Sequence, residues 1–127
     1  MFTEMRTAAL LQKALHGPEV LPATRALRMA TIDGARAVGL EEEIGSVELG
    51  KKADLSVVSL NGLHSSPQTS DLISSIVYSC QPADVRTVFV DGQMLMSDRK
   101  LVTLDESEVI REAERQTSKL LVRAGLN

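Results

Sequence analysis

The chain has 127 residues, the length of one ordinary domain, and 43% of them are apolar, which is enough for a hydrophobic core. The net charge of -3 and the thin spread of lysine and arginine argue against a nucleic-acid-binding surface. No apolar run approaches membrane-spanning length, the N-terminus does not resemble a signal peptide, and Cys80 is the single cysteine. We therefore expect a soluble protein of the reducing cytoplasm.

The beginning of the chain is predicted to be helical. In residues 1–16 the apolar side chains recur at three- and four-residue steps, and Gly17-Pro18 follows them. Pro22 is suited to the first position of a second helix, over residues 22–29. Either Thr31 or Asp33 is suited to cap a third helix, which Gly39 ends. The apolar positions of the first helix are Met1, Met5, Ala8, Ala9, Leu11 and Leu15.

A turn-rich stretch over residues 44–52 precedes the first predicted strand, 54–60. After a polar loop over residues 61–70, Asp71 is suited to cap a short helix that runs to Ile76. These elements mark a change from helices to strands, and regular alternation of strand and helix is missing. A complete parallel α/β unit is therefore not expected.

A β-hairpin is predicted from residue 85 to residue 97. Asp91-Gly92 is a strong signal for a two-residue turn between strands 85–90 and 93–97. Both 54–60 and 85–90 carry apolar side chains on each of their faces, so both need cover on two sides. Because two or three strands are few for an independent sheet, a partner segment outside the chain would explain this pattern.

The last predicted helix, residues 105–124, is amphipathic, with its charged residues opposite an apolar face. A capping box precedes it, formed either by Thr103 with Glu106 or by Asp105 with Glu108. The apolar face holds Val109, Ile110, Ala113, Thr117, Leu120, Leu121 and Ala124.

The residues that could bind a metal or act in catalysis do not form a recognisable active-site motif. His16 and His64 lie far apart in the sequence and have no neighbouring ligand, which does not suit a zinc site. We interpret His16 as a solvated histidine near a helix C-terminus. His64 is either a residue that orders its loop or one near a substrate entrance. Cys80 lacks a nearby activating base, so we expect a buried structural thiol.

The charged runs have structural interpretations as well. Glu41-Glu42-Glu43 and Lys51-Lys52 are interpreted as solvated surface. Gly45 and Gly50, followed by Lys51, have the glycine spacing of a phosphate-binding loop. The motif fails because Lys52 replaces the required Ser or Thr and a strand follows where a helix is needed. We therefore expect no catalytic, cofactor-binding or metal-binding residue in this chain.

Two motifs resemble the amidohydrolase superfamily. Residues 26–40, ALRMATIDGARAVGL, resemble the last barrel helices of that superfamily, and residues 44–55, IGSVELGKKADL, resemble the return of its chain into a small β-sandwich. Asp84-Val85 with Asp91-Gly92 is similar to the hairpin that closes this sandwich. The resemblance covers nearly the whole chain. It implies an α+β fragment of an α/β protein: the last helices of a (β/α)8 barrel, the C-terminal part of a sandwich and a terminal helix.

Within the superfamily, His64, Pro67, the segment 77–79 and the segment 103–106 resemble one branch. This branch holds cytosine and guanine deaminases, S-adenosylhomocysteine and methylthioadenosine deaminases, and triazine chlorohydrolases. The resemblance implies that one divalent metal, zinc or iron, activates a hydroxide that attacks a purine, pyrimidine or triazine carbon. The family's metal ligands cannot be placed on this sequence, and a complete barrel needs roughly 250 residues.

The resemblance divides the chain into barrel helices (1–43), C-terminal strands of the composite sandwich (44–104) and a C-terminal helix (105–127). It implies a fragment that stabilises a metal-dependent hydrolase and is not catalytic alone. The expected partner is the N-terminal barrel and sandwich segment of the same protein. Without it, the chain is expected to self-associate, unless the first helix folds back onto the sheet. The alternative function is an independent α/β interaction module without enzymatic activity.

Overall fold

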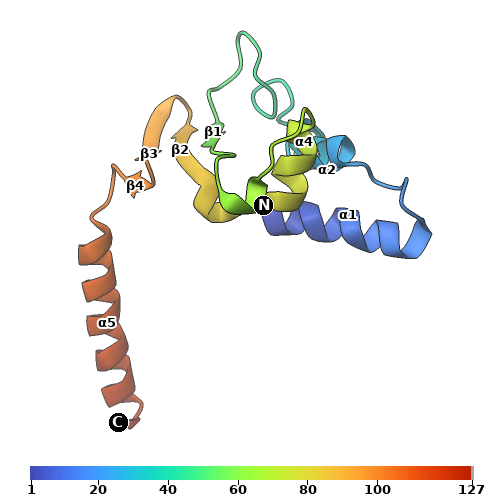
Figure 1. Cartoon of the computed structure of the whole chain (residues 1–127). Helices are drawn as coiled ribbons and strands as arrows, with labels where there is room; N and C mark the ends of the chain where they lie inside the picture. The colour runs from blue at the N-terminus through green and yellow to red at the C-terminus, as the bar shows by residue number, and fades with distance from the viewer. Residues whose placement is uncertain (127) are drawn as a thin grey trace.

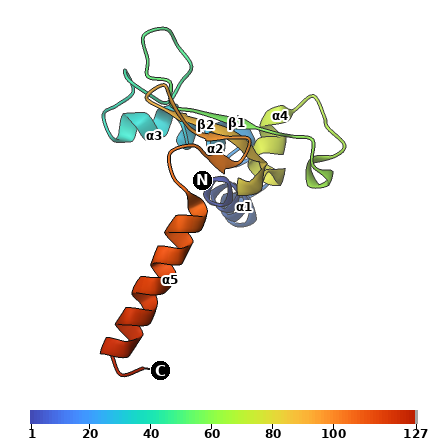
Figure 2. The ribbon, with the colours of Figure 1, turned by 90° about the vertical axis from the view of Figure 1, so that its left-hand side faces the viewer.

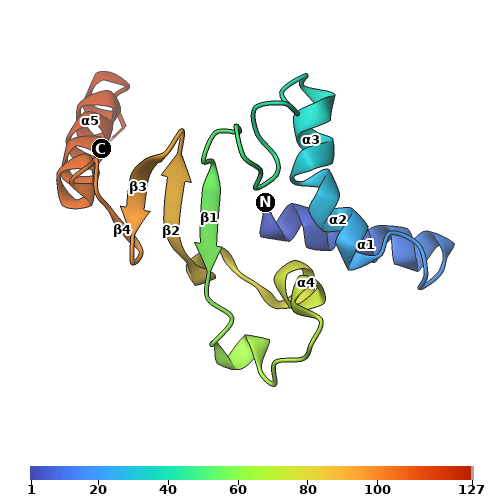
Figure 3. The same ribbon diagram turned by 90° about the horizontal axis from the view of Figure 1, so that it is seen from above.

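The structure is a computed structural model that describes residues 1–126. A helical N-terminal part lies beside a four-stranded antiparallel sheet, and the C-terminal helix extends away from both (Figure 1). From above, β1 is the strand next to the helices and β4 is the strand next to the C-terminal helix (Figure 3). This mixture of helices and sheet agrees with the fold class predicted from the sequence.

The three predicted N-terminal helices are present as α1 (Phe2–His16), α2 (Ala23–Met29) and α3 (Ile32–Ala37). Gly17 ends α1 with a positive φ of 103°, which a residue with a side chain rarely adopts. Pro22 is the N-cap of α2 and not its first helical residue, so this prediction was wrong by one position.

Neither of the residues proposed to cap α3 does so with its side chain. Thr31 occupies the N-cap position, but its hydroxyl donates to the carbonyl of Leu27 at 2.8 Å. The carboxylate of Asp33 accepts a hydrogen bond from Arg28 and another from Arg36, both at 3.2 Å. The side chains of Thr31 and Asp33 therefore do not bind the free N–H groups of α3. They bind a nearby carbonyl and two nearby arginines instead.

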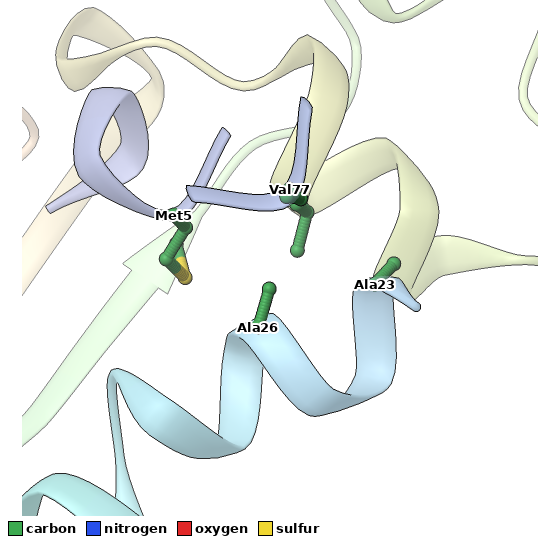
Figure 4. Close-up of a cluster of buried hydrophobic side chains, with 5 residues drawn as sticks. Met5, Ala23, Ala26 and Val77 are labelled. Atoms are coloured by element: carbon green, nitrogen blue, oxygen red, sulfur yellow. The ribbon is translucent and has the colours of Figure 1, made fainter. Parts of the chain in front are cut away.

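The main hydrophobic core is small and lies where α1, α2 and a later helical segment meet (Figure 4). Three of its five buried members are alanines, so the helices approach closely and little side-chain volume separates them. Leu11 and Leu15 of the predicted apolar stripe are exposed instead. The buried members are Met5, Ala9, Ala23, Ala26 and Val77.

The later helical segment begins as α4 (Leu72–Ser74) and continues as the π-helix Ser75–Ser79. As predicted, Asp71 caps it, accepting a hydrogen bond from the N–H of Ser74 at 2.9 Å. The helical conformation extends beyond the predicted end at Ile76 because Val77 is drawn into the core.

The sheet contains β1 (Leu55–Val58), β2 (Val85–Val90), β3 (Gln93–Ser97) and the short β4 (Lys100–Leu101), in that order. β1 is shorter than the predicted strand 54–60, and β4 was not predicted. Neighbouring strands are antiparallel throughout. β1 is hydrogen-bonded only to β2, so its other edge has no strand partner among residues 1–126.

The predicted hairpin turn is confirmed. Asp91 has a φ of 49° and Gly92 a φ of 77°, the pair of positive values that a type I′ turn requires. The Asp91 N–H donates to Oδ1 of Asp54 at 2.6 Å, and the Gly92 N–H donates to the carbonyl of Ala53 at 3.2 Å. The turn is therefore fixed to the segment that leads into β1.

The C-terminal helix α5 (Glu106–Arg123) is capped by Asp105, which accepts a hydrogen bond from the N–H of Glu108 at 3.1 Å. Asp105 is therefore the N-cap, as in the second of the two predicted capping boxes, but only this one of the two hydrogen bonds of a capping box is made. α5 is exposed along its whole length and projects from the rest of the molecule (Figure 2). Within residues 1–126, no helix combines the length and the apolar character needed to cross a membrane.

Candidate functional site

The two histidines are not brought together. His16 is the exposed last residue of α1, as expected for a solvated histidine. His64 lies in the 3-10 turn Leu63–Ser65. Among residues 1–126, no three His, Cys, Asp or Glu side chains are grouped so that they could hold a metal ion. Residues 1–126 therefore hold no group of side chains that fits a metal site.

His64 is part of a small polar cluster with Asp84 and Gln81. Its Nε2 lies 2.7 Å from Oδ2 of Asp84, and the same oxygen accepts a hydrogen bond from the Gln81 N–H at 2.8 Å. The Gln81 N–H and the His64 ring hold the pKa of the Asp84 carboxyl below its usual value. The ring also covers Gly62, where a Cβ would lie 2.5 Å from Cε1 of His64.

This cluster joins two loops that are far apart in the sequence. It therefore fits the interpretation of His64 as a residue that orders its loop. The sequence offered no signal for the pairing, because Asp84 stood out only as part of the hairpin motif. The spacing of twenty positions between the two residues corresponds to no local structure.

Cys80 is completely buried and forms no disulfide, which confirms the prediction of a buried thiol. Burial raises the pKa of this thiol, and the Asp84 carboxylate acts in the same direction. A thiol held in its protonated form is a poor nucleophile. The backbone carbonyl of Cys80, by contrast, accepts a hydrogen bond from Nη2 of Arg6 at 2.6 Å.

Arg6 is a structural residue that the sequence did not single out. It projects from α1 to the end of the π-helix, where its Nε also lies 3.4 Å from the carbonyl of Val77. Carbonyls in the last turn of a helix lack partners within the helix, and a cation there also interacts favourably with the helix dipole. Arg6 thus connects α1 to the C-terminal end of the segment 72–80.

The charged residues near Gly45 hold the turn-rich loop together. Nζ of Lys51 donates to the carbonyl of Glu41 at 2.5 Å and to the hydroxyl of Ser46 at 2.7 Å. Nζ of Lys52 lies 2.6 Å from the carboxylate of Glu43. Lys51 and Lys52 therefore have structural partners, where the sequence suggested a solvated surface.

Gly45 is needed for two independent reasons. Its φ is 91°, and a Cβ on it would lie 2.8 Å from the Cβ of Ala35. Gly50 has nearly the same φ, 92°, but its surroundings are open. The two glycines therefore allow the turns that lead into β1. Because a strand follows these turns and not a helix, the structure agrees with the prediction that they do not form a phosphate-binding loop.

An apolar groove lies between the N-terminal helices and β1. Its volume is about 780 Å³. The groove runs next to the free edge of β1, so unpaired backbone groups and apolar side chains lie side by side. Such an arrangement is suited to receiving another segment of polypeptide. Its apolar lining includes Phe2, Met5, Leu27, Ile44, Leu55 and Val85.

Comparison with known proteins identifies the family. Residues 1–95 match the sequence profile of the amidohydrolase family. The chain belongs to the amidohydrolase family. This confirms the resemblance seen in the motifs at residues 26–40 and 44–55.

Curated relatives in this amidohydrolase family are deaminases. The chain is 46% identical over 121 residues to 5'-deoxyadenosine deaminase of Methanobrevibacter smithii. It is 48% identical over 122 residues to 5-methylthioadenosine/S-adenosylhomocysteine deaminase of Desulforudis audaxviator. These matches cover 94% and 95% of the chain but only 28% of each relative. The chain corresponds to the C-terminal portion of such relatives.

Solved amidohydrolase structures share the fold. An adenosine deaminase of Xanthomonas campestris with bound zinc is 35% identical, with a TM-score of 0.88. The match covers 96% of this chain and 28% of that one. The zinc complex of an atrazine chlorohydrolase of Arthrobacter aurescens TC1 has a TM-score of 0.79 at 24% identity, over 91% of this chain and 26% of that one. At that identity the likeness concerns the fold alone.

Proposed function

We propose that this chain is the C-terminal part of a metal-dependent amidohydrolase that removes the amino group of a purine ring by hydrolysis. The observation that carries the proposal is the identity of 44–48% to deaminases of 5'-deoxyadenosine, methylthioadenosine and S-adenosylhomocysteine. Its substrate would be an adenosine that lacks the 5' hydroxyl group or carries a sulfur substituent in its place. The weaker likeness to triazine hydrolases supports the fold and makes chloride release the less favoured reaction.

In this proposal the chain has a structural role. Residues 1–43 would supply the last helices of the barrel, residues 44–104 would supply strands of a composite sandwich, and residues 105–127 would form the terminal helix. The free edge of β1 and the groove of about 780 Å³ beside it support this role, because both suit an additional polypeptide segment.

The partner proposed for this surface is the N-terminal segment of the same protein, which would include the barrel. One divalent metal, zinc or iron, would be bound by residues outside this chain and would supply the activated water. The zinc in the solved adenosine deaminase and chlorohydrolase supports a metal in the whole protein. In the absence of its partner segment, the chain is proposed to self-associate.

A chimera tests this function. The C-terminal 28% of the Desulforudis audaxviator deaminase is replaced by this chain. Ammonia release is measured with methylthioadenosine, 5'-deoxyadenosine and S-adenosylhomocysteine, and chloride release is measured with atrazine. We expect the chimera to deaminate the adenosine derivatives and to leave atrazine intact. A matched chimera with Val77→Asp, which places a charge in the buried core, is expected to be inactive.

Two results would contradict the proposal. A chimera that folds but has no deaminase activity would show that the chain cannot serve as this structural part. Ammonia release by the isolated chain would show that it carries catalytic residues of its own.

A further inference from the structure

Asn61-Gly62 lies in the polar loop that follows β1 and leads into the turn at His64. The sequence holds two asparagines, and Asn61 is the one that a glycine follows. Asparagine is a thermolabile residue because the next backbone nitrogen can attack its side-chain amide. Glycine leaves that nitrogen unhindered, since it has no Cβ. Asn61 is also exposed, so water can reach the pair.

The hydrogen bonds of Gly62 leave its nitrogen free to react. The Gly62 carbonyl accepts a hydrogen bond from the N–H of Ser65 at 3.0 Å and another from the hydroxyl of Ser66 at 3.2 Å. None of the hydrogen bonds among residues 1–126 uses the Gly62 N–H. The carbonyl of Gly62 is therefore fixed, while its nitrogen has no partner that competes with a reaction.

The side-chain carbonyl of Asn61 is polarised by Gln68. Nε2 of Gln68 donates to Oδ1 of Asn61 at 3.2 Å and to the carbonyl of Leu60 at 2.8 Å. The shorter bond holds Gln68 in place, so the longer one orients the Asn61 amide. A donor on a carbonyl oxygen stabilises the negative charge that develops there when a nucleophile attacks the carbon.

His64 supplies a base beside the same nitrogen. Its Nε2 lies 2.7 Å from Oδ2 of Asp84, and a neutral imidazole that donates from Nε2 carries its lone pair on Nδ1. Nδ1 lies 2.9 Å from the position that a Cβ of Gly62 would occupy, and this position adjoins the same Cα as the amide nitrogen. The pairing with Asp84 therefore leaves the basic nitrogen of His64 on the side of Gly62.

We propose that Asn61-Gly62 is a self-modification site at which His64 acts as the general base for deamidation. Nδ1 of His64 takes the proton of the Gly62 N–H, and the nitrogen forms a bond to Cγ of Asn61. The bond from Cγ to Nδ2 breaks, and the amide group leaves as ammonia with the proton that His64 returns. A solvent water molecule then opens the cyclic imide at either of its carbonyls. The product at position 61 is aspartate, or isoaspartate, in which the backbone runs through the side-chain carboxyl group.

Deamidation changes the loop that His64 orders. Both products place a carboxylate where a neutral amide was, and isoaspartate also lengthens the backbone by a methylene group. Ammonia is released once per chain and without any added substrate. This separates the reaction from the repeated turnover of a deaminase.

Peptide mapping of the full chain tests the site. The chain is incubated at neutral pH and physiological temperature, and trypsin, which cuts after Lys52 and Arg86, then releases residues 53–86. Mass spectrometry measures the replacement of the Asn61 amide by a carboxylate. We expect conversion at Asn61 with a matching release of ammonia. A folded chain that keeps Asn61 intact while the same chain converts in urea would overturn the proposal.

Two histidine substitutions test the base. His64→Gln keeps a side-chain donor for Asp84 and removes the base, whereas His16→Gln changes the exposed histidine at the end of α1. We expect His64→Gln to slow the conversion of the folded chain at least about tenfold and His16→Gln to leave it unchanged. In urea the three proteins should convert at the same rate, because the base acts only when the loop is folded.

The direction of the effect separates a base from a residue that only orders the loop. If His64 only ordered the loop, its loss would leave conversion equal or faster. Asp84→Asn is a second variant, which allows the other tautomer of His64 and should also slow conversion. Circular dichroism confirms that both variants are folded. Conversion of either variant as fast as that of the unmodified chain, or a slowing that persists in urea, would overturn the role of His64.

Discussion

The contact made by Arg6 gives the sharpest test of how the N-terminal helices are held. Replacing Arg6 by Met keeps the unbranched apolar stem and removes the guanidinium. The lost hydrogen bonds are those to the Cys80 carbonyl at 2.6 Å and to the Val77 carbonyl at 3.4 Å. The first has good length and a charged donor, which is worth about 1.5–3 kcal/mol, whereas the second is long and adds little.

We therefore expect Arg6→Met to lower the free energy of unfolding by about 2 kcal/mol. Urea denaturation followed by far-UV circular dichroism measures this quantity. Fluorescence of Tyr78, the only tyrosine, adds a local probe because it packs against the same core. Arg115→Met is the control: Arg115 forms an exposed ion pair with Glu112 at 2.6 Å, which is worth at most about 1 kcal/mol. Equal stabilities of Arg6→Met and the unmodified chain would refute the role assigned to Arg6.

Three further predictions concern backbone and charge. Gly92→Val should lower the free energy of unfolding by about 1 kcal/mol or more, because its φ of 77° resists a β-branched residue; an unchanged melting temperature would argue against the turn. Gly45→Ala should destabilise the chain more than Gly50→Ala, since the two share a positive φ but only Gly45 has Ala35 within 2.8 Å of the added Cβ; equal losses in urea denaturation would exclude the packing argument. The lowered pKa of Asp84 means that its carboxylate stabilises the fold above the usual pKa of aspartate, about 3.9, and that this contribution is lost as the pH falls through the lowered value. The stability difference between the unmodified chain and Asp84→Asn should therefore be largest near pH 6 and shrink at more acidic pH, and a constant difference across the titration would contradict this.

Local patterns in the sequence predicted the local structure well. The periodicity of residues 1–16 and 105–124 gave two helices, and Asp91-Gly92 gave the hairpin, because each of these signals acts between near neighbours. Boundaries were less accurate. The π-helix Ser75–Ser79 extends the predicted helix because Val77 is buried in a core built from distant residues.

Contacts between distant segments were not predictable in the same way. The pairing of His64 with Asp84 and that of Arg6 with Cys80 depend on the tertiary arrangement, and no spacing rule connects them. The motif at residues 44–55 was recognised by resemblance alone. The structure supplies its physical reason: Lys51 and Gly45 form the loop, and Asp54 fixes the hairpin turn at Asp91.

Fragment complementation tests the proposed function most directly. The Desulforudis audaxviator deaminase is shortened by its C-terminal 28%, and this chain is added as a separate polypeptide. Neither part alone is expected to release ammonia from methylthioadenosine, and the mixture is expected to do so as the two parts bind. If the parts bind no better than unrelated proteins and the mixture stays inactive, or if this chain is active alone, the chain is not the structural C-terminal part of such an enzyme.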